Sequence, residues 1–302
     1  MDKLIPLLPT PLQELKNDVT RIAGVKLYLK RDDLIHPTVS GNKWRKLKYN
    51  IAEAQSQKYR TLLTFGGAYS NHLYATAAAG NAAGLQTIGV VRGEDVAQRM
   101  TPTLLFCEEQ NMKLHFVSRQ EYRLRNDPDY LNQLSARFGL PYIIPEGGSS
   151  VQALKGVAEM TAEVDIVLDQ KPDYYSVAAG TGGTAAGILY SGNNVLAFSA
   201  LKGGDFLADD IMHLIPDKNA AGKLDLQTNY HFGGYGKWTP QLIDFILTFK
   251  NEFHVQLEQI YTAKMFYGLF DLIGRNYFIP GTVIVAVHTG GLQGLTDEAR
   301  IA

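Results

Sequence analysis

The sequence predicts an α/β fold with doubly wound, mostly parallel sheets, and three observations lead to it. Short apolar segments alternate with segments whose apolar residues recur at helical spacing along most of the 302 residues. Most of the expected strands are continuous apolar runs, as expected when helices cover both faces of a sheet. Several of these strands end in glycines that lead directly into a helix.

The expected elements of the first half follow one another in strict alternation. Segment 60–67 is an apolar run that ends in glycines, and Thr101 with Pro102 forms a good N-cap and first-turn pair for the helix that begins there. The expected strands are 25–30, 60–67, 86–93, 113–118 and 141–148, and the expected helices are 43–57, 71–84, 101–112 and 120–139.

The same alternation continues in the second half. The long segment 150–169 has apolar residues at helical spacing, and 281–291 reads as the last strand. Further strands are expected at 174–180 and 194–201, and further helices at 183–192, 206–215, 240–253 and 261–274. Ligands of such folds bind at the carboxyl ends of strands, which here are four glycine-marked segments. These segments are 65–72, 145–150, 178–184 and 288–291.

Composition and charge exclude several classes of function. Lys and Arg number 29 against 30 for Asp and Glu, so no global field recruits nucleic acid or a membrane. The single cysteine, Cys107, cannot form a disulfide within the chain, which fits a cytoplasmic location. Prolines interrupt the N-terminal apolar run, unlike a signal peptide, and no run approaches the roughly 18 residues that span a bilayer. The seven histidines are scattered without metal-ligand spacing, so we expect no metal.

The segment 176–187 is a candidate phosphate site. A buried strand runs into Gly180, Thr181, Gly182, Gly183 and Thr184 and then into a helix. Glycines let backbone N–H groups approach an anion, the helix start adds positive potential, and the threonines add hydroxyl donors. A loose dinucleotide fingerprint is present, but the next strand lacks the acidic residue that holds a ribose, so a single phosphate fits better. The alternative is a tight turn that binds nothing.

Two further stretches carry polar residues at expected helix starts. Ser70 and Asn71 occupy an N-cap and first turn, where free N–H groups hold a carboxylate unless the pair is a plain cap. His72, taken alone, is more often structural than catalytic. Segment 31–33, with two adjacent aspartates, is expected to be a solvated turn or cap rather than an acid–base pair.

Lys43 is placed where a cation is disfavoured. It opens a helix, after Asn42, and the exposed N–H groups of a helix start already carry partial positive charge. A partly desolvated lysine there has its charged form disfavoured, and a neutral amine forms an imine with an aldehyde. A lysine of this kind together with a phosphate cradle indicates pyridoxal phosphate as the cofactor. The alternative is a solvated lysine in a basic helix start.

Several of these stretches, in this order, resemble the aminocyclopropanecarboxylate deaminase/D-cysteine desulfhydrase family. They are "KRDDLIHPTVSGNKWRKLKY", "FGGAYSNH", "GTGGT", "GGYG", "YTAKMFYG" and "HTGG". These proteins are pyridoxal-phosphate enzymes of fold type II, and the resemblance covers about residues 8–295, with an apparent shortening around 200–235. It implies two α/β domains, with residues 1–47 and 151–302 in the larger and 48–150 inserted as the smaller, and a homodimer.

The resemblance also implies a role for each matching residue. Lys43 is then the cofactor-linked lysine and proton carrier, and Gly180–Thr184 hold the cofactor phosphate. Ser70, Asn71 and His72 match the loop for the substrate carboxylate, and Asn71 also the cofactor ring. Tyr235 and Tyr261 match two active-site tyrosines.

Two positions bear on the substrate. In the deaminase pattern a glutamate follows the tyrosine matched by Tyr261 and a leucine stands at position 289, whereas this chain has Thr262 and Thr289, as in D-cysteine desulfhydrases. A carboxylate near the pyridine nitrogen keeps it protonated and makes a strong electron sink, which ring opening needs and loss of a β-thiolate does not. We therefore expect D-cysteine to be converted to pyruvate, sulfide and ammonia.

Other readings of the chain remain open at this point. They are aminocyclopropanecarboxylate deaminase, another fold-type II enzyme such as a dehydratase or a β-replacement enzyme, and a protein that binds the cofactor or an amino acid without turnover.

Overall fold

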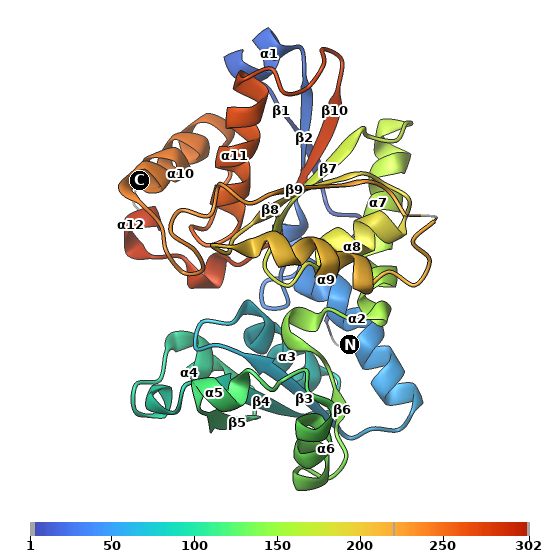
Figure 1. Ribbon diagram of the computed structural model, residues 1–302, viewed down its shortest axis with the longest axis vertical. Helices are drawn as coiled ribbons and strands as arrows, with labels where there is room; N and C mark the ends of the chain where they lie inside the picture. The colour runs from blue at the N-terminus through green and yellow to red at the C-terminus, as the bar shows by residue number, and fades with distance from the viewer. Residues whose placement is uncertain (1–3, 220, 301–302) are drawn as a thin grey trace.

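The structure is a computed structural model that describes residues 4–219 and 221–300, so the ends of the predicted larger domain, 1–3 and 301–302, lie outside it. Its strands form two sheets, which Figure 1 shows one above the other. The six-stranded sheet has the order β1-β2-β10-β7-β8-β9, and the four-stranded sheet has the order β5-β4-β3-β6. Only the β1–β2 pair is antiparallel among the pairs described, which confirms the α/β class with mostly parallel sheets.

The six strands of the larger sheet come from both ends of the chain. They are β1 (Leu12–Leu15), β2 (Lys26–Lys30), β7 (Tyr174–Ala179), β8 (Val195–Ser199), β9 (Leu224–Gln227) and β10 (Val283–Val287). The smaller sheet uses one continuous stretch of the chain. It consists of β3 (Thr61–Gly66), β4 (Gln86–Arg92), β5 (Met112–Val117) and β6 (Tyr142–Ile143).

Helices cover both faces of the larger sheet. One face packs against α1 (Asp18–Ala23), α10 (Pro240–Phe253), α11 (Thr262–Gly274) and α12 (Asp297–Arg300). The other packs against α7 (Val151–Leu168), α8 (Gly183–Tyr190) and α9 (Leu207–His213). The central strands β7, β8 and β10 are almost fully buried, which explains their nearly uninterrupted apolar sequences.

The smaller sheet is also covered on both faces. Its helices are α3 (Asn71–Ala82), α4 (Pro102–Glu109), α5 (Arg119–Tyr122) and α6 (Pro128–Arg137), and α2 (Asn42–Ser56) packs beside α3. Helix α2 continues without a break across the predicted domain boundary at 47/48, and it also packs along α7. The helix that begins next to Lys43 therefore bridges the two sheets, while the domain division itself stays a prediction.

Five elements differ from the sequence-based expectation. The strand expected at 141–148 is only two residues long, because Pro145 has no N–H and both Gly147 and Gly148 take positive φ. The helix expected at 120–139 is split into α5 and α6. Strands β1 and β9 and the short helix α1 were not expected at all. Among the described residues, no helix is long and apolar enough to span a membrane.

Candidate active site

Lys43 lies at the start of α2, beside the end of the last strand of the larger sheet. Gly41 precedes it with φ 62°, and a Cβ there would overlap the carbonyl oxygen of Thr289. The Asn42 N–H donates to the same carbonyl at 3.3 Å. Lys43, Asn71 and Thr289 line one small pocket, so residues more than 200 positions apart in sequence meet here.

The surroundings of Lys43 disfavour its charge. Burial lowers the pKa of the Lys43 amine to about 8, although the Glu146 carboxylate partly opposes the shift. An ordinary lysine is almost wholly protonated at neutral pH, whereas this one has an appreciable neutral fraction. The lowered pKa follows from burial of the amine, which agrees with the expectation of a desolvated lysine and not with a solvated one.

The loop that joins β7 to α8 forms an open anion cradle. Gly182 has φ 74°, and α8 begins after it without a side-chain cap, so its first N–H groups are available. The Thr184 hydroxyl accepts from Asn42 Nδ2 at 2.8 Å, and the hydroxyls of Thr181 and Ser149 lie 2.7 Å apart. The cradle is thus joined to the helix that carries Lys43 and to the glycine-marked end of the smaller sheet.

Lys46 is a site residue that sequence reasoning missed. Its side chain is buried, and its amine donates to Gly147 O at 3.2 Å and to Ser149 Oγ at 3.4 Å. A Cβ built on Gly183 would lie 2.9 Å from the Lys46 Nζ atom, so this amine reaches the cradle itself. The signal was present, because Lys46 follows Lys43 by three residues, which places both on one face of a helix.

In the part of the chain that the structure describes, neither the Lys43 nor the Lys46 amine has a hydrogen bond to a carboxylate. Burial, and then the neighbouring Lys43, hold the pKa of Lys46 well below its usual value. The Lys46 amine, whose charge is disfavoured, gains from a bound dianion, because the dianion favours the charged form and accepts charge-assisted hydrogen bonds. Glycine backbone, threonine hydroxyls, a helix start and Lys46 together fit the phosphate of the expected cofactor.

The segment Ser70–His72 begins α3 as expected. Ser70 is the N-cap, and its hydroxyl accepts from Leu73 N at 3.2 Å, so the capping interpretation holds whatever else this residue does. The backbone N–H groups of Asn71 and His72 are the first two of the helix and have no acceptor within it. They are available to a carboxylate at the edge of the pocket that Asn71 lines.

The His72 side chain lies beneath this loop. Its Nε2 atom is 2.8 Å from the Thr64 hydroxyl, which in turn donates to Ile144 O, so Nε2 carries the proton. The Nδ1 atom is buried and has no partner in the described structure. Burial lowers the pKa of His72 well below its usual value, and the two nearby lysines add to the shift. The ring is therefore neutral, and a contact between His72 and a substrate carboxylate would use its backbone N–H.

The two predicted tyrosines lie together. Their ring centroids are 6.0 Å apart in an edge-to-face arrangement. A Cβ on Gly180 would be 3.0 Å from Tyr261 Cε1, so Tyr261 adjoins the first residue of the cradle. Burial, followed by the neighbouring Tyr235, raises the pKa of Tyr261 well above its usual value, so the phenol holds its proton at neutral pH.

Thr262 begins α11 and is bound to Glu258, not to the residues of the cradle. The buried Glu258 carboxylate accepts from the N–H groups of Ile260, Tyr261 and Thr262 and from the Thr262 hydroxyl at 3.0 Å. These four donors use the acceptor sites of the carboxylate. Thr289, in contrast, lines the pocket with Lys43.

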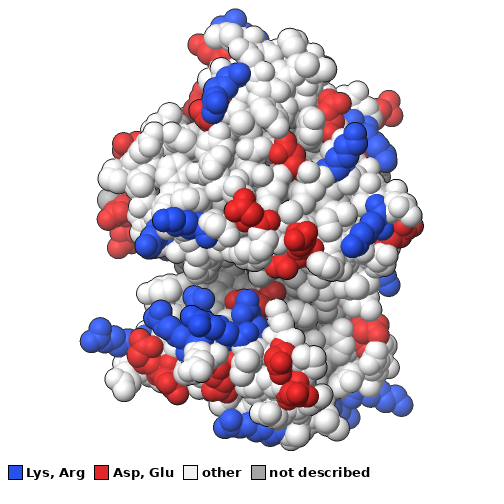
Figure 2. All heavy atoms as spheres, viewed as in Figure 1, with Lys and Arg blue, Asp and Glu red and all other residues white. Residues whose placement is uncertain are grey.

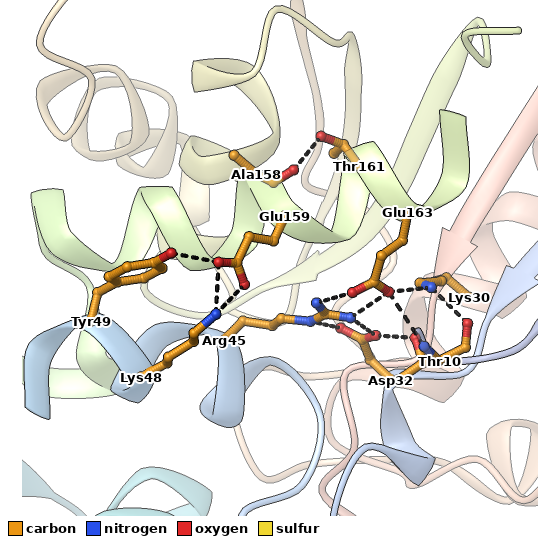
Figure 3. A network of polar contacts seen from close by, with 10 residues as sticks. All are labelled: Thr10, Lys30, Asp32, Arg45, Lys48, Tyr49, Ala158, Glu159, Thr161 and Glu163. Atoms are coloured by element: carbon orange, nitrogen blue, oxygen red, sulfur yellow. Dashed lines mark hydrogen bonds and ion pairs between the residues drawn. The ribbon is translucent and has the colours of Figure 1, made fainter. Parts of the chain in front are cut away.

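A buried network of charges holds α2 in place (Figure 3). Arg45, two residues after Lys43, donates to Asp32 at 2.9 Å and to Glu163 of α7 at 2.6 Å, and Lys30 donates to Glu163 at 2.6 Å. The expectation of a solvated turn at 31–33 is therefore wrong. Asp32 and Asp33 are both buried. Arg45, distant in sequence, neutralises Asp32, and Arg31, on the same turn, neutralises Asp33.

A cleft lies between the part of the molecule built on the larger sheet and the part built on the smaller sheet (Figure 2). Lys and Arg side chains gather at the edge of this cleft, on the side of the smaller sheet. Arg92 ends β4 at the carboxyl edge of the smaller sheet, and its guanidinium lies 3.5 Å from the position of a Cβ on Gly67. Ligands of parallel sheets bind at this edge. In the described ranges, no cluster of three or more His, Cys, Asp or Glu side chains is placed to hold a metal ion.

Comparison with known proteins identifies the family of the chain. The chain belongs to the family of pyridoxal-phosphate dependent enzymes, whose family model matches residues 5–191. That confirms the predicted class of enzyme and its cofactor. The matched span contains Lys43, Lys46 and the cradle at 180–184.

Particular relatives narrow the branch of the family. The chain is 32% identical to the bifunctional D-cysteine desulfhydrase/1-aminocyclopropane-1-carboxylate deaminase, mitochondrial, of Arabidopsis thaliana, over 96% of this chain and 78% of the relative. It is 29% identical to D-cysteine desulfhydrase of Salmonella typhi over 95% of this chain and 93% of the relative. The crystal structure of an ACC deaminase homologue superposes with a TM-score of 0.82 at 29% identity, covering 96% of this chain and 91% of that one. The predicted resemblance to the aminocyclopropanecarboxylate deaminase/D-cysteine desulfhydrase family is confirmed.

Proposed function

We propose that the protein catalyses β-elimination on a small amino acid, with D-cysteine as the best substrate. The observation that carries the proposal is Thr262, which stands where the deaminase pattern has a glutamate. Glu258 does not replace that glutamate, because its oxygens are occupied by the start of α11. Without a free carboxylate at this position, the site favours a reaction with a good leaving group over the opening of an aminocyclopropane ring.

The first task of the site is to hold the substrate and remove its α-proton. When bound, pyridoxal phosphate supplies the electron sink that stabilises negative charge at the substrate α-carbon. Lys43 is the attachment point for its aldehyde, and Lys46 with the 180–184 cradle would hold its phosphate. The free N–H groups of Asn71 and His72 bind the substrate carboxylate. Lys43, with its pKa near 8, then accepts the α-proton as a neutral amine.

The second task is to protonate the departing sulfur. Tyr261 and Tyr235 keep their phenolic protons at neutral pH, because burial raises the pKa of Tyr261 and partial desolvation raises that of Tyr235, which is 41% exposed. Either hydroxyl can give a proton to the thiolate as the Cβ–S bond breaks. Ser70, at the head of α3, adjoins the bound carboxylate. Overall, D-cysteine and one water yield pyruvate, ammonia and hydrogen sulfide.

The proposal is tested by assaying the purified holoenzyme with D-cysteine, L-cysteine and 1-aminocyclopropane-1-carboxylate. Sulfide and pyruvate report elimination, and 2-oxobutanoate with ammonia reports ring opening. We expect kcat/KM to be highest for D-cysteine. Robust ring opening by the unmodified protein would refute the argument from Thr262. Binding of amino acids without formation of any product would show that the protein is a non-catalytic binding protein.

A further inference from the structure

The loop that carries Tyr235 has an unusual backbone. Four of its residues take positive φ, one of them not a glycine. They are Phe232 at 49°, Gly233 at 93°, Gly234 at 113° and Gly236 at 65°. The loop lies between β9 and α10 and has no regular secondary structure of its own. Glycines take positive φ without strain, so the costly position is Phe232, whose conformation persists only where the surrounding structure holds it.

Lys264 lies beneath the loop. It belongs to the first turn of α11, and only 1% of its surface is exposed. Its amine donates to His231 O and to Gly234 O, both at 2.9 Å. The carbonyls on either side of the turn at Phe232 thus converge on one buried amine. A buried lysine is costly unless its donors are satisfied, and both hydrogen bonds described for this one go to a single loop.

The loop contacts the reaction site through one residue. Tyr235 directly follows Gly234, and its ring packs edge-to-face on Tyr261. Tyr261 is the N-cap of α11, three residues before Lys264. One helix start therefore determines the positions of both tyrosines, of Tyr261 through its own backbone and of Tyr235 through the amine of Lys264.

Lys264 has no role in the chemistry described above. Burial lowers the pKa of its amine to about 8, with the Glu258 carboxylate partly opposing the shift. Other contacts join Tyr230 and Phe232, at the start of the loop, to α11. The Tyr230 hydroxyl donates to Asp271 at 2.6 Å, and the rings of Phe232 and Tyr267 are 5.0 Å apart. Gly234, the residue before Tyr235, is also held within the loop, because its N–H donates to His231 O at 3.0 Å and its carbonyl accepts from Lys237 N at 3.2 Å. Of the contacts named here between the loop and α11, those of Lys264 are the ones that reach Gly234.

We propose that Lys264 is a positioning residue for Tyr235, with its amine as the centre around which the loop 231–236 folds. It touches neither substrate nor cofactor and acts on the reaction by keeping the Tyr235 phenol against Tyr261. The effect on turnover rests on the proposed function, whereas the effect on the loop does not.

The test compares Lys264→Met with the wild-type holoenzyme and with a control variant, Lys26→Met. The control removes an exposed lysine that is far in sequence from Lys264 and from the loop 231–236. Methionine keeps most of the apolar stem and removes the donor. We expect faster hydrogen exchange of the amides of 231–236 only in Lys264→Met, with an unchanged spectrum of the bound cofactor. We expect kcat/KM to fall about 10- to 100-fold, the effect of a small misplacement of a catalytic group.

A double-mutant cycle with Tyr235→Phe separates positioning from general damage. If Lys264 acts through Tyr235, adding Lys264→Met to Tyr235→Phe lowers kcat/KM by no more than about twofold further. Fully multiplicative losses, or unchanged exchange of the loop, would overturn the proposal. Absence of turnover in the wild type would refute the proposed function, and the exchange data would still decide the role of Lys264.

A second pair of variants covers the case in which Lys264→Met does not fold. Lys264→Arg keeps a charged donor and Lys264→Gln keeps only a neutral one. The proposal requires the loop to be protected from exchange in the arginine variant and less protected in the glutamine variant. Equal exchange in these two variants would contradict it.

Discussion

Glu163→Gln removes the charge at the centre of the buried network that holds α2. Glu163 accepts from Arg45 and Lys30, whose side chains are 2% and 1% exposed, and is itself 16% exposed (Figure 3). The change leaves two buried cations with one carboxylate, Asp32. Breaking a buried ion pair by removing one partner costs about 3–5 kcal/mol, and the partial exposure of Glu163 places the expected loss at about 3 kcal/mol. That corresponds to a change of the unfolding equilibrium constant on the order of 100-fold.

Glu159→Gln is the matched control, one turn away on the same helix. Glu159 pairs with Lys48 at 2.7 Å, but these side chains are 33% and 39% exposed, so the expected loss is about 0–1 kcal/mol. Urea unfolding followed by tryptophan fluorescence measures both losses, because Trp44 is buried in α2 beside Arg45. The comparison is made without cofactor, since a bound ligand stabilises the folded state by mass action.

The pH dependence of the same pair tests the cause. Burial alone would raise the pKa of Glu163, but hydrogen bonds from Arg45 and Lys30 outweigh it, and the pKa is lowered. A carboxyl group with a lowered folded-state pKa contributes stability above its unfolded pKa, and this contribution is lost as the pH falls through the folded value. The difference between wild type and Glu163→Gln should therefore shrink in acid. Equal losses for both variants, or a difference independent of pH, would refute the reasoning.

Two further predictions concern single side chains. Lys46→Met should weaken cofactor binding about 10- to 100-fold, since a hydrogen bond to a charged group contributes about 1.5–3 kcal/mol, whereas Lys48→Met should not; equal affinities by equilibrium titration would exclude Lys46 from the phosphate site. Burial raises the pKa of the Cys107 thiol to about 12, so a disulfide reagent at pH 8 should modify this residue only after unfolding, and prompt reaction of the native protein would contradict its burial.

Much of the fold followed from sequence because its strands are buried on both faces and leave a clear apolar signal. The edge strands β1 and β9 gave no such signal, since half of the residues in "LQEL" and in "LDLQ" are polar and both strands are only partly buried. The predicted strand at 141–148 was too long. The positive φ values of Gly147 and Gly148 belong to a turn, which brings Gly147 O within hydrogen-bond distance of the Lys46 amine.

The site was predictable where a motif carried its own chemistry, as at Lys43 and the cradle. It was not predictable where a role depends on a distant partner. Asp32 was predicted to be a surface residue because its partners are distant in sequence. Arg45, which neutralises its charge, is 13 residues away, and Thr10, whose hydroxyl donates to it, is 22 residues away. Lys264 lies within the motif "YTAKMFYG". Its role was not predictable from that motif, because the two carbonyls that accept from its amine, in the loop at 231–234, are about 30 residues earlier.

The central claim is that the amine of Lys43, rather than that of Lys46 three residues later, bonds to the cofactor aldehyde. Borohydride reduction of the purified holoenzyme makes that bond permanent, and peptide mapping by mass spectrometry then locates it. Modification of Lys43 alone, with no modified peptide from Lys43→Ala, is the predicted result. A cofactor found on Lys46 or Lys264, or on no lysine, would contradict the account.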